Sequence, residues 1–97
     1  MKIQSGEHQA SKENMDWELH KGHGSRTFRE TVKFPEPFQV PPTVVVGLTM
    51  FDIHAEQNAR LMVYVVKAEF NQFTIEYRTW ASSRVLEARA SWFAYGK

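Results

Sequence analysis

The sequence predicts an all-β fold, either an antiparallel β-sandwich or a barrel. Apolar and polar residues alternate with a period of two along most of the chain, so successive side chains fall on opposite faces of a strand. Turn signals separate these segments at short spacing, and no segment carries the apolar stripe of an amphipathic helix. With 97 residues available, we expect a single small domain spanning residues 1–97.

The first half of the chain contains two segments with strand periodicity. Apolar and polar residues alternate over residues 15–19 and again over residues 27–34. The polar segment EHQASKENM at 7–15 has no apolar face and is expected to be a loop. HKGHGS at 20–25 and the proline-rich FPEPFQVPP at 34–42 are turn signals that separate the strands.

Two segments in the middle of the chain are apolar on both faces. They are TVVVGLTMF at 43–51 and LMVYVV at 61–66, with the turn signal AEQN at 55–58 between them. A sandwich has only one inside, so a strand that is apolar on both faces needs a second cover. We expect a second copy of the chain to provide that cover. The alternative is that these are central strands shielded by the proline-rich loop.

The last two strands show the clearest alternation. Residues 86–94 place small apolar side chains and Trp92 on one face, opposite polar and aromatic residues. In FTIEYRTW at 73–80, the alternation places Trp80 on the same face as Glu76 and Arg78. A large apolar ring on a polar face near a strand end is a candidate contact for a ligand.

Composition and charge exclude several classes of protein. The 12 basic and 11 acidic residues give a net charge of +1, which predicts no nucleic-acid partner. No apolar run approaches the roughly 20 residues of a membrane span, so no membrane insertion is expected. We expect a soluble protein, cytoplasmic or exported without a classical signal peptide. The absence of cysteine excludes disulfides and leaves oligomerisation as the usual supplement to a small core.

No catalytic motif is present, and the chain is not expected to be an enzyme. We find no nucleophile elbow, phosphate-binding loop, H-E-x-x-H pair or EF-hand loop. His20 and His23 lack a third ligand, so no metal site is expected. His8 and His54 are isolated, and the carboxylates fall on outward strand positions where they are expected to be solvated. No cofactor is indicated.

Seven sequence segments carry a resemblance to a known family. In chain order they are KIQSG at the N-terminus, Trp17, VKFPEPFQVPP at 32–42, VVVGLTMFD at 44–52, QNAR at 57–60, YRTW at 77–80 and ASW at 90–92. Together they resemble the H-type lectin domain, the family of the snail agglutinins and the discoidin C-terminal domain. The resemblance covers essentially the whole chain.

This resemblance implies a six-stranded antiparallel β-sandwich that assembles as a homotrimer with a sugar site in each cleft between protomers. Members of the family typically bind terminal N-acetylgalactosamine or galactose on glycans, agglutinate cells and are not enzymes. Trp80 matches the tryptophan that contacts the sugar, and Arg60 matches the sugar-contacting arginine. The loop that contains Gly22, His23 and Gly24 matches the one supplied by the neighbouring protomer.

Two departures from the family pattern lead to an alternative. Ala81 stands where the family often has a histidine, and HKGHGSR at 20–26 contains no acidic residue to accept from sugar hydroxyls. His23 is closest to that acceptor position, and Gly22 and Gly24 permit close backbone approach or positive φ. The alternative is a module of the same fold with a degenerate sugar site, retained for trimerisation or protein interaction.

Overall fold

The structure, a computed structural model, describes residues 1–56 and 58–97. Gln57, which belongs to the expected turn AEQN and to the segment QNAR, lies outside the described residues. The described residues form six strands in two antiparallel three-stranded sheets, with strand orders β1-β6-β3 and β2-β5-β4. The bounds are β1 (Lys2–Ser11), β2 (Arg26–Lys33), β3 (Thr43–Ile53), β4 (Met62–Ala68), β5 (Gln72–Thr79) and β6 (Val85–Gly96). The all-β, six-stranded prediction is confirmed.

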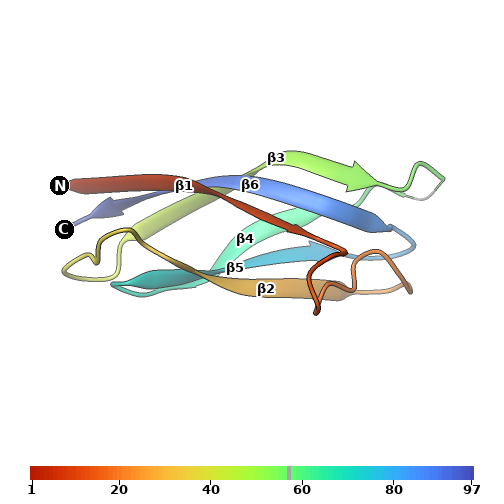
Figure 1. Cartoon of the computed structure of the whole chain (residues 1–97), viewed down its shortest axis with the longest axis horizontal. Helices are drawn as coiled ribbons and strands as arrows, with labels where there is room; N and C mark the ends of the chain where they lie inside the picture. The colour runs from red at the N-terminus through yellow and green to blue at the C-terminus, as the bar shows by residue number, and fades with distance from the viewer. Residues whose placement is uncertain (57) are drawn as a thin grey trace.

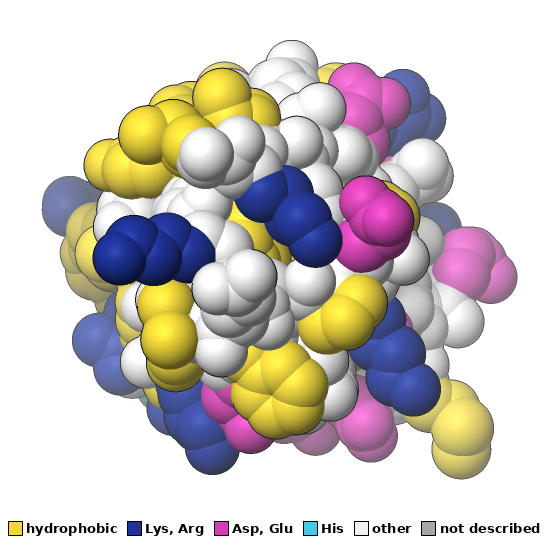
Figure 2. Space-filling model, turned by 90° about the vertical axis from the view of Figure 1, so that its left-hand side faces the viewer, with side chains coloured by type: hydrophobic (Ala, Val, Ile, Leu, Met, Phe, Trp, Pro, Cys, Tyr) yellow, Lys and Arg dark blue, Asp and Glu magenta, His cyan; other side chains and the backbone are white. Residues whose placement is uncertain are grey.

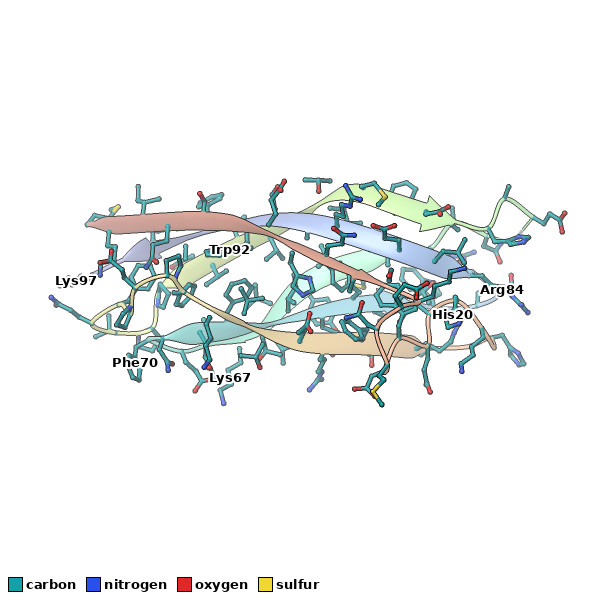
Figure 3. The ribbon with its side chains drawn as sticks, viewed as in Figure 1. His20, Lys67, Phe70, Arg84, Trp92 and Lys97 are labelled. Atoms are coloured by element: carbon teal, nitrogen blue, oxygen red, sulfur yellow. The ribbon has the colours of Figure 1, made fainter. Side chains whose placement is uncertain are left out.

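The two sheets lie face to face in a molecule that measures 46 × 20 × 20 Å (Figure 1). Both termini, the β2–β3 loop and the β4–β5 turn lie at one end of the long axis. The β1–β2 loop, the β3–β4 loop and the β5–β6 turn lie at the other end, which we call the loop end (Figure 1). In Figure 3, His20 and Arg84 mark the loop end, whereas Phe70 and Lys97 mark the opposite one.

The centre of the core lies between the inner faces of β5 and β6, and buried residues of β1, β2 and the loops extend it. The alternating residues Phe73, Ile75 and Tyr77 of β5 are fully buried, as the sequence predicts. They face the small-residue side of β6, where alanines at alternate positions let the sheets approach closely around Trp92. The centroids of the Trp92 and Phe73 rings lie 5.2 Å apart, and the indole fills the interior between the sheets (Figure 3).

The expectations for the first 20 residues are wrong in two places. Residues 2–11 form β1, which pairs with β6, although 7–15 was expected to be a loop. Its two faces are both largely polar, so alternation of polarity could not reveal it. Residues 15–19 are not a strand, yet Trp17 and Leu19 are buried. Their period of two reflects two loop side chains packed into the end of the sandwich, where Trp17 Nε1 donates to the Val85 carbonyl at 2.8 Å.

Polar contacts close the flank of the sandwich formed by β1 and β2. The His8 ring lies between the sheets, with Nδ1 2.9 Å from the Tyr77 hydroxyl and Nε2 2.5 Å from Glu30 Oε1. The expectation that His8 is isolated is therefore wrong. Further along, the Gln4 side chain donates to the Glu36 carbonyl and accepts from the Glu36 N–H.

The opposite flank, formed by β3 and β4, is apolar and partly open. Both are edge strands that pack against each other, so the alternative of shielded central strands is wrong. The inward side chains on this flank are only half-buried: Val44, Val46, Leu48, Val63 and Val65. On the outward side, Val45 is 43% exposed and Phe51 is 56% exposed. The second apolar face that the sequence predicts is thus uncovered in a single chain.

One carboxylate is buried where solvation was expected. Glu76 lies on the outward side of the central strand β5, yet it is 1% exposed. Arg29 Nε donates to its Oε1, and the register places Arg29 and Tyr64 on either side of it. Neighbours on both sides cover an outward position on a central strand, which the sequence pattern does not show.

Gly6 is required by the close approach of Trp92. A Cβ added at Gly6 would lie 2.8 Å from Trp92 Cζ2, and the buried indole has little room to move. We expect Gly6→Ala to lower the free energy of unfolding by about 1 to 3 kcal/mol, measured by urea denaturation. Gly47→Ala is the control, because a Cβ there meets nothing within 4 Å. Equal stability of the two variants would contradict this packing.

The buried Tyr77 hydroxyl predicts a loss of stability at alkaline pH. Burial, followed by the nearby Glu30 carboxylate, raises the pKa of Tyr77 well above its usual value. The Tyr77 hydroxyl therefore loses its proton at a lower pH in the unfolded chain than in the folded protein. Its contribution to the free energy of unfolding is intact below about pH 10 and falls above it by up to about 1.4 kcal/mol per pH unit. Urea unfolding between pH 9 and 11 should show a steeper decline for wild type than for Tyr77→Phe. Tyr64→Phe, on the outward face, should retain the wild-type decline.

Candidate functional site

The residues that the sequence singles out gather at the loop end. Trp80 lies in the β5–β6 turn, Arg60 in the β3–β4 loop, and Gly22, His23 and Gly24 in the β1–β2 loop. β5 and β6 are the central strands of their sheets, whereas the other two connections join edge strands. The Trp80 turn is therefore the middle one of three connections that cross between the sheets (Figure 1).

Trp80 directly follows β5 and lies outside the hydrophobic core. Its side chain is half-buried, whereas the flanking Thr79 and Ser83 are fully buried. The turn closes with a hydrogen bond from the Ser83 N–H to the Trp80 carbonyl at 3.4 Å. Ala81 adopts φ of 59°, a left-handed conformation that is uncommon for residues other than glycine. The indole is thus presented on a tight, anchored turn.

Arg60 is held beside this turn through its backbone. Its N–H donates to the Ser83 hydroxyl at 3.0 Å, and its carbonyl accepts from the Thr79 hydroxyl at 2.5 Å. The two buried hydroxyls on either side of Trp80 therefore fix the Arg60 backbone, while the Arg60 side chain stays exposed. The sequence signal that could have revealed this link is the pair of hydroxyl residues, Thr79 and Ser83, on either side of Trp80.

The β1–β2 loop touches the other side of the same turn. Gly22 and Gly24 have φ of 73° and 82°, conformations that glycine adopts without strain. The Gly24 N–H donates to the Ala81 carbonyl at 2.8 Å. His23 is exposed at the tip of this loop, so its ring is available to a partner outside the chain.

Arg26 is a site residue that the sequence analysis missed. Its Nε donates to the Gly24 carbonyl at 2.9 Å, and one terminal nitrogen donates to the carbonyls of Lys21 at 2.8 Å and Leu19 at 3.4 Å. The other terminal nitrogen donates to the Ala81 carbonyl at 3.0 Å. A basic residue at a strand start after a glycine-rich turn is a weak signal, since most such residues are solvated.

The electrostatic surroundings of Arg26 are unusual for a basic residue. Within the described part of the chain, no carboxylate oxygen lies within 4.0 Å of its guanidinium nitrogens. Desolvation by burial, together with the nearby charge of Arg84, lowers the pKa of Arg26 from its usual value. The acceptors that compensate its charge are backbone carbonyls.

Histidines and carboxylates do not cluster at the loop end. Among residues 1–56 and 58–97, no three side chains of His, Cys, Asp or Glu come together in a way that could hold a metal ion. His20 is half-buried, and its Nδ1 is enclosed without a hydrogen-bond partner. The same residues contain no helix that is long and apolar enough to cross a membrane.

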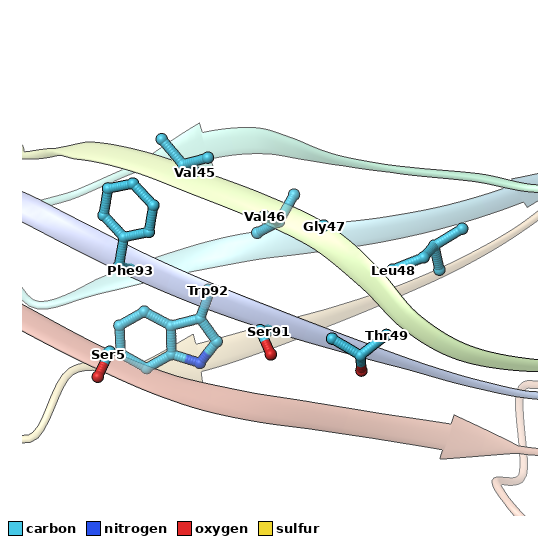
Figure 4. A pocket seen from close by; sticks show the side chains of 9 residues that line it. All are labelled: Ser5, Val45, Val46, Gly47, Leu48, Thr49, Ser91, Trp92 and Phe93. Carbon is cyan, nitrogen blue, oxygen red and sulfur yellow. The ribbon is translucent and has the colours of Figure 1, made fainter.

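Hollows in the surface include two that lie away from the loop end. One of about 390 Å³ lies over β1, β6 and β3, and the residues that line it carry no acid or base (Figure 4). The second, of about 560 Å³, lies by the termini and includes Val40, Pro41 and Tyr95. Figure 2 looks onto that end, where apolar side chains form separate groups among lysine and arginine side chains.

The comparison with known families decides the classification. Residues 29–95 match the H-type lectin domain. The chain belongs to the H-type lectin domain family. Arg60 and Trp80 lie within the matched range, whereas Gly22, His23, Gly24 and Arg26 precede it. Membership of this lectin family supports carbohydrate binding and a non-enzymatic role.

Solved structures share the fold of this H-type lectin domain. Two structures of discoidin II from Dictyostelium discoideum superpose with TM-scores of 0.85 and 0.84, each at 28% identity. Both alignments cover 96% of this chain but only 36% and 35% of the discoidin II chains. The present chain therefore corresponds to about a third of discoidin II.

A relative from Fuscovulum blasticum is more similar in sequence. It is described as ORF 7 of the ATP synthase subunits region, and it is 39% identical over 75 residues. The match covers 77% of this H-type lectin domain chain and 65% of the relative.

Proposed function

We propose that this protein is a lectin that binds terminal N-acetylgalactosamine- or galactose-type sugars in the clefts between the protomers of a homotrimer. The observation that carries the proposal is the Arg60–Trp80 pair at the loop end. A half-buried indole and an exposed guanidinium stand on neighbouring connections, whose backbones are joined through Thr79 and Ser83.

Trp80 supplies the apolar surface of the proposed site. A pyranose ring has an apolar C–H face and a rim of hydroxyl groups, so it stacks on an aromatic plate and takes hydrogen bonds at its edge. The turn anchored by Thr79 and Ser83 holds the Trp80 backbone in place, so little conformational entropy is lost when a sugar stacks on the ring.

Arg60 supplies directed hydrogen-bond donors. The planar guanidinium suits two neighbouring sugar hydroxyls or an acetamido carbonyl, a geometry that lysine does not reproduce. Its backbone is fixed while its side chain remains exposed. The guanidinium therefore extends from a backbone that is fixed to the Trp80 turn, and its donors are available to the proposed ligand.

The loop 22–24 of the neighbouring protomer completes the proposed cleft. His23 is exposed at its tip, and a neutral imidazole offers one acceptor nitrogen to a sugar hydroxyl. The main chain around Gly22 provides further polar groups where the family has a carboxylate.

The apolar flank formed by β3 and β4 supports assembly. Its inward valines are half-buried and its outward side chains are exposed, whereas the β1–β2 flank is closed by polar contacts. Two unlike flanks favour a contact between different surfaces of neighbouring protomers, which closes into a ring when the rotation is right. Three copies in such a ring cover the apolar flank and bring a neighbour's loop to each site.

Trimerisation also compensates for a weak individual site. Contacts with one face of a monosaccharide give an affinity of about 0.1 to 1 mM, because much of the polar gain only replaces hydrogen bonds to water. Three sites on one body bind a glycan-coated surface with much greater avidity. The expected activity is agglutination of cells or glycan-coated beads, and adhesion to glycoproteins or glycolipids.

The second candidate function is a trimeric interaction module of the same fold with a degenerate sugar site. Ala81 in place of the family histidine favours it, as does the absence of an acidic residue from HKGHGSR. The anchored Arg60–Trp80 pair opposes it, because a module without ligand has no need to expose an indole on a fixed turn.

Trp80→Ala tests the proposed site. We expect it to reduce binding on a glycan array, and the affinity for the best monosaccharide, by at least about tenfold. Because Trp80 lies outside the core, the free energy of unfolding should change by less than about 1 kcal/mol. Phe70→Ala is the matched control, since this exposed aromatic lies at the opposite end (Figure 3). A trimeric wild-type protein without glycan hits would favour the second candidate.

Lysine substitutions on the β3–β4 flank test the trimer. Val45 and Met62 are 43% and 41% exposed in the single chain, so Val45→Lys and Met62→Lys should leave the fold intact. In the trimer they bury an unpaired charge, and light scattering should show monomers in place of trimers. Val40→Lys, which lies in the β2–β3 loop outside both strands of the flank, should remain trimeric. Trimers formed by both flank variants would exclude this flank as the interface.

A further inference from the structure

Arg26 joins two parts of the loop end that belong to different connections. Its guanidinium donates to the carbonyls of Leu19, Lys21 and Gly24 in the β1–β2 loop, and to that of Ala81 in the β5–β6 turn. The Gly24 N–H donates to the same Ala81 carbonyl at 2.8 Å. Both groups therefore converge on one oxygen next to Trp80.

We propose that Arg26 is a positioning residue of the sugar site, which locks the loop 20–25 and the Trp80 turn into one rigid unit. The inference rests on the proposed function. Four of the five N–H donors of Arg26 already bond to carbonyl oxygens, so we assign it a positioning role and not a direct contact with the sugar. It acts through Gly24 and Ala81.

The geometry of the guanidinium explains why arginine occupies this position. Donors at Nε and at both terminal nitrogens point in fixed directions, so one side chain bonds to carbonyls on two sides. A lysine ammonium is a compact point charge and cannot reach the carbonyls of Gly24, Lys21 and Ala81 with the same alignment. Loss of the guanidinium would leave the Lys21 and Gly24 carbonyls without this donor, whereas the Ala81 carbonyl would keep the bond from the Gly24 N–H.

The conformation of Ala81 gives a second reason for such a lock. Its φ of 59° is unfavourable for alanine and persists only where the surroundings fix it. The carbonyl of this residue receives hydrogen bonds from both Gly24 and Arg26. These two bonds therefore stabilise the turn that presents the indole.

In the proposed trimer, the lock links neighbouring sites. The loop 20–25 of each protomer faces the site of its neighbour, whereas Trp80 belongs to the protomer's own site. Arg26 thus sets the position of an element in each of two clefts. Loss of the lock should impair both halves of every site in a trimer of identical variants.

The test compares Arg26→Lys with Arg84→Lys in the full-length protein. Arg84 is an exposed arginine at the same end, and its side chain makes no hydrogen bond within the described residues, so it is the matched control (Figure 3). The probe is the best monosaccharide from the glycan array, titrated by calorimetry. The second readout, independent of sugar, is NMR hydrogen exchange of the Gly24 amide, with the indole signal of Trp80 recorded alongside.

We expect Arg26→Lys to weaken sugar binding by about tenfold or more while the oligomeric state and the midpoint of thermal unfolding stay near wild type. Exchange of the Gly24 amide should be at least about fivefold faster, and the Trp80 indole signal should shift or broaden. Arg84→Lys should match wild type in each readout. If Arg26 served only the stability of the fold, Arg26→Lys would instead lower the midpoint of thermal unfolding and leave the sugar affinity of the folded protein unchanged.

Three results would overturn the inference. They are wild-type affinity in Arg26→Lys, unchanged Gly24 exchange in that variant, and a Gly24 amide that already exchanges freely in the wild-type protein. The last measurement needs no variant, so it holds even if Arg26→Lys does not fold. Wild-type protein that binds no glycan but shows a protected Gly24 amide would refute the proposed function, whereas the link made by Arg26 would stand.

Discussion

The close approach of the two central strands is the constraint on which the rest of the molecule depends. The alanines of β6 and the glycine opposite Trp92 let β6 lie near the aromatic face of β5, with the indole packed between them. β5 and β6 are consecutive and central, so the turn that joins them inherits their fixed positions. Trp80 is therefore presented by the turn that joins the two central strands, although it lies outside the core.

The two flanks of the sandwich differ in polarity. On the β1–β2 flank, His8, Gln4 and their partners satisfy polar groups between the sheets and close the edge. On the β3–β4 flank, valines reach only half-burial, and the outward side chains add to the apolar surface. An edge strand with an apolar surface invites association unless it is covered. Among the described residues this half-buried apolar surface lies along the β3–β4 flank, and the proposed trimer depends on that asymmetry.

The sequence predicted the all-β class and the buried face of β5 formed by Phe73, Ile75 and Tyr77, because both depend on local alternation along the strands. It missed β1 and misjudged His8 and Glu76, because their environments are set by partners far away in the sequence. His8 is 22 residues from Glu30 and 69 from Tyr77. The sequence analysis missed the role of Arg26 for the same reason. Its hydrogen bond to the Ala81 carbonyl spans 55 residues, and a single arginine carries no periodic signal. The alternation of apolar and polar residues identifies the two faces of a strand, whereas tertiary contacts decide which polar side chains are buried.

The energetics of the Trp80 turn explain why its anchors are polar. Leaving an indole half-exposed forgoes hydrophobic stabilisation, at about 25 cal/mol for each Å² not buried, and the φ of Ala81 adds strain. A turn held by apolar packing would relax by folding the ring inward. Here the hydroxyls of Thr79 and Ser83 bond to the Arg60 backbone, and buried hydrogen bonds of this kind are costly to break. Directional bonds oppose the inward collapse that non-directional hydrophobic attraction favours, and so they keep the ring where a ligand reaches it.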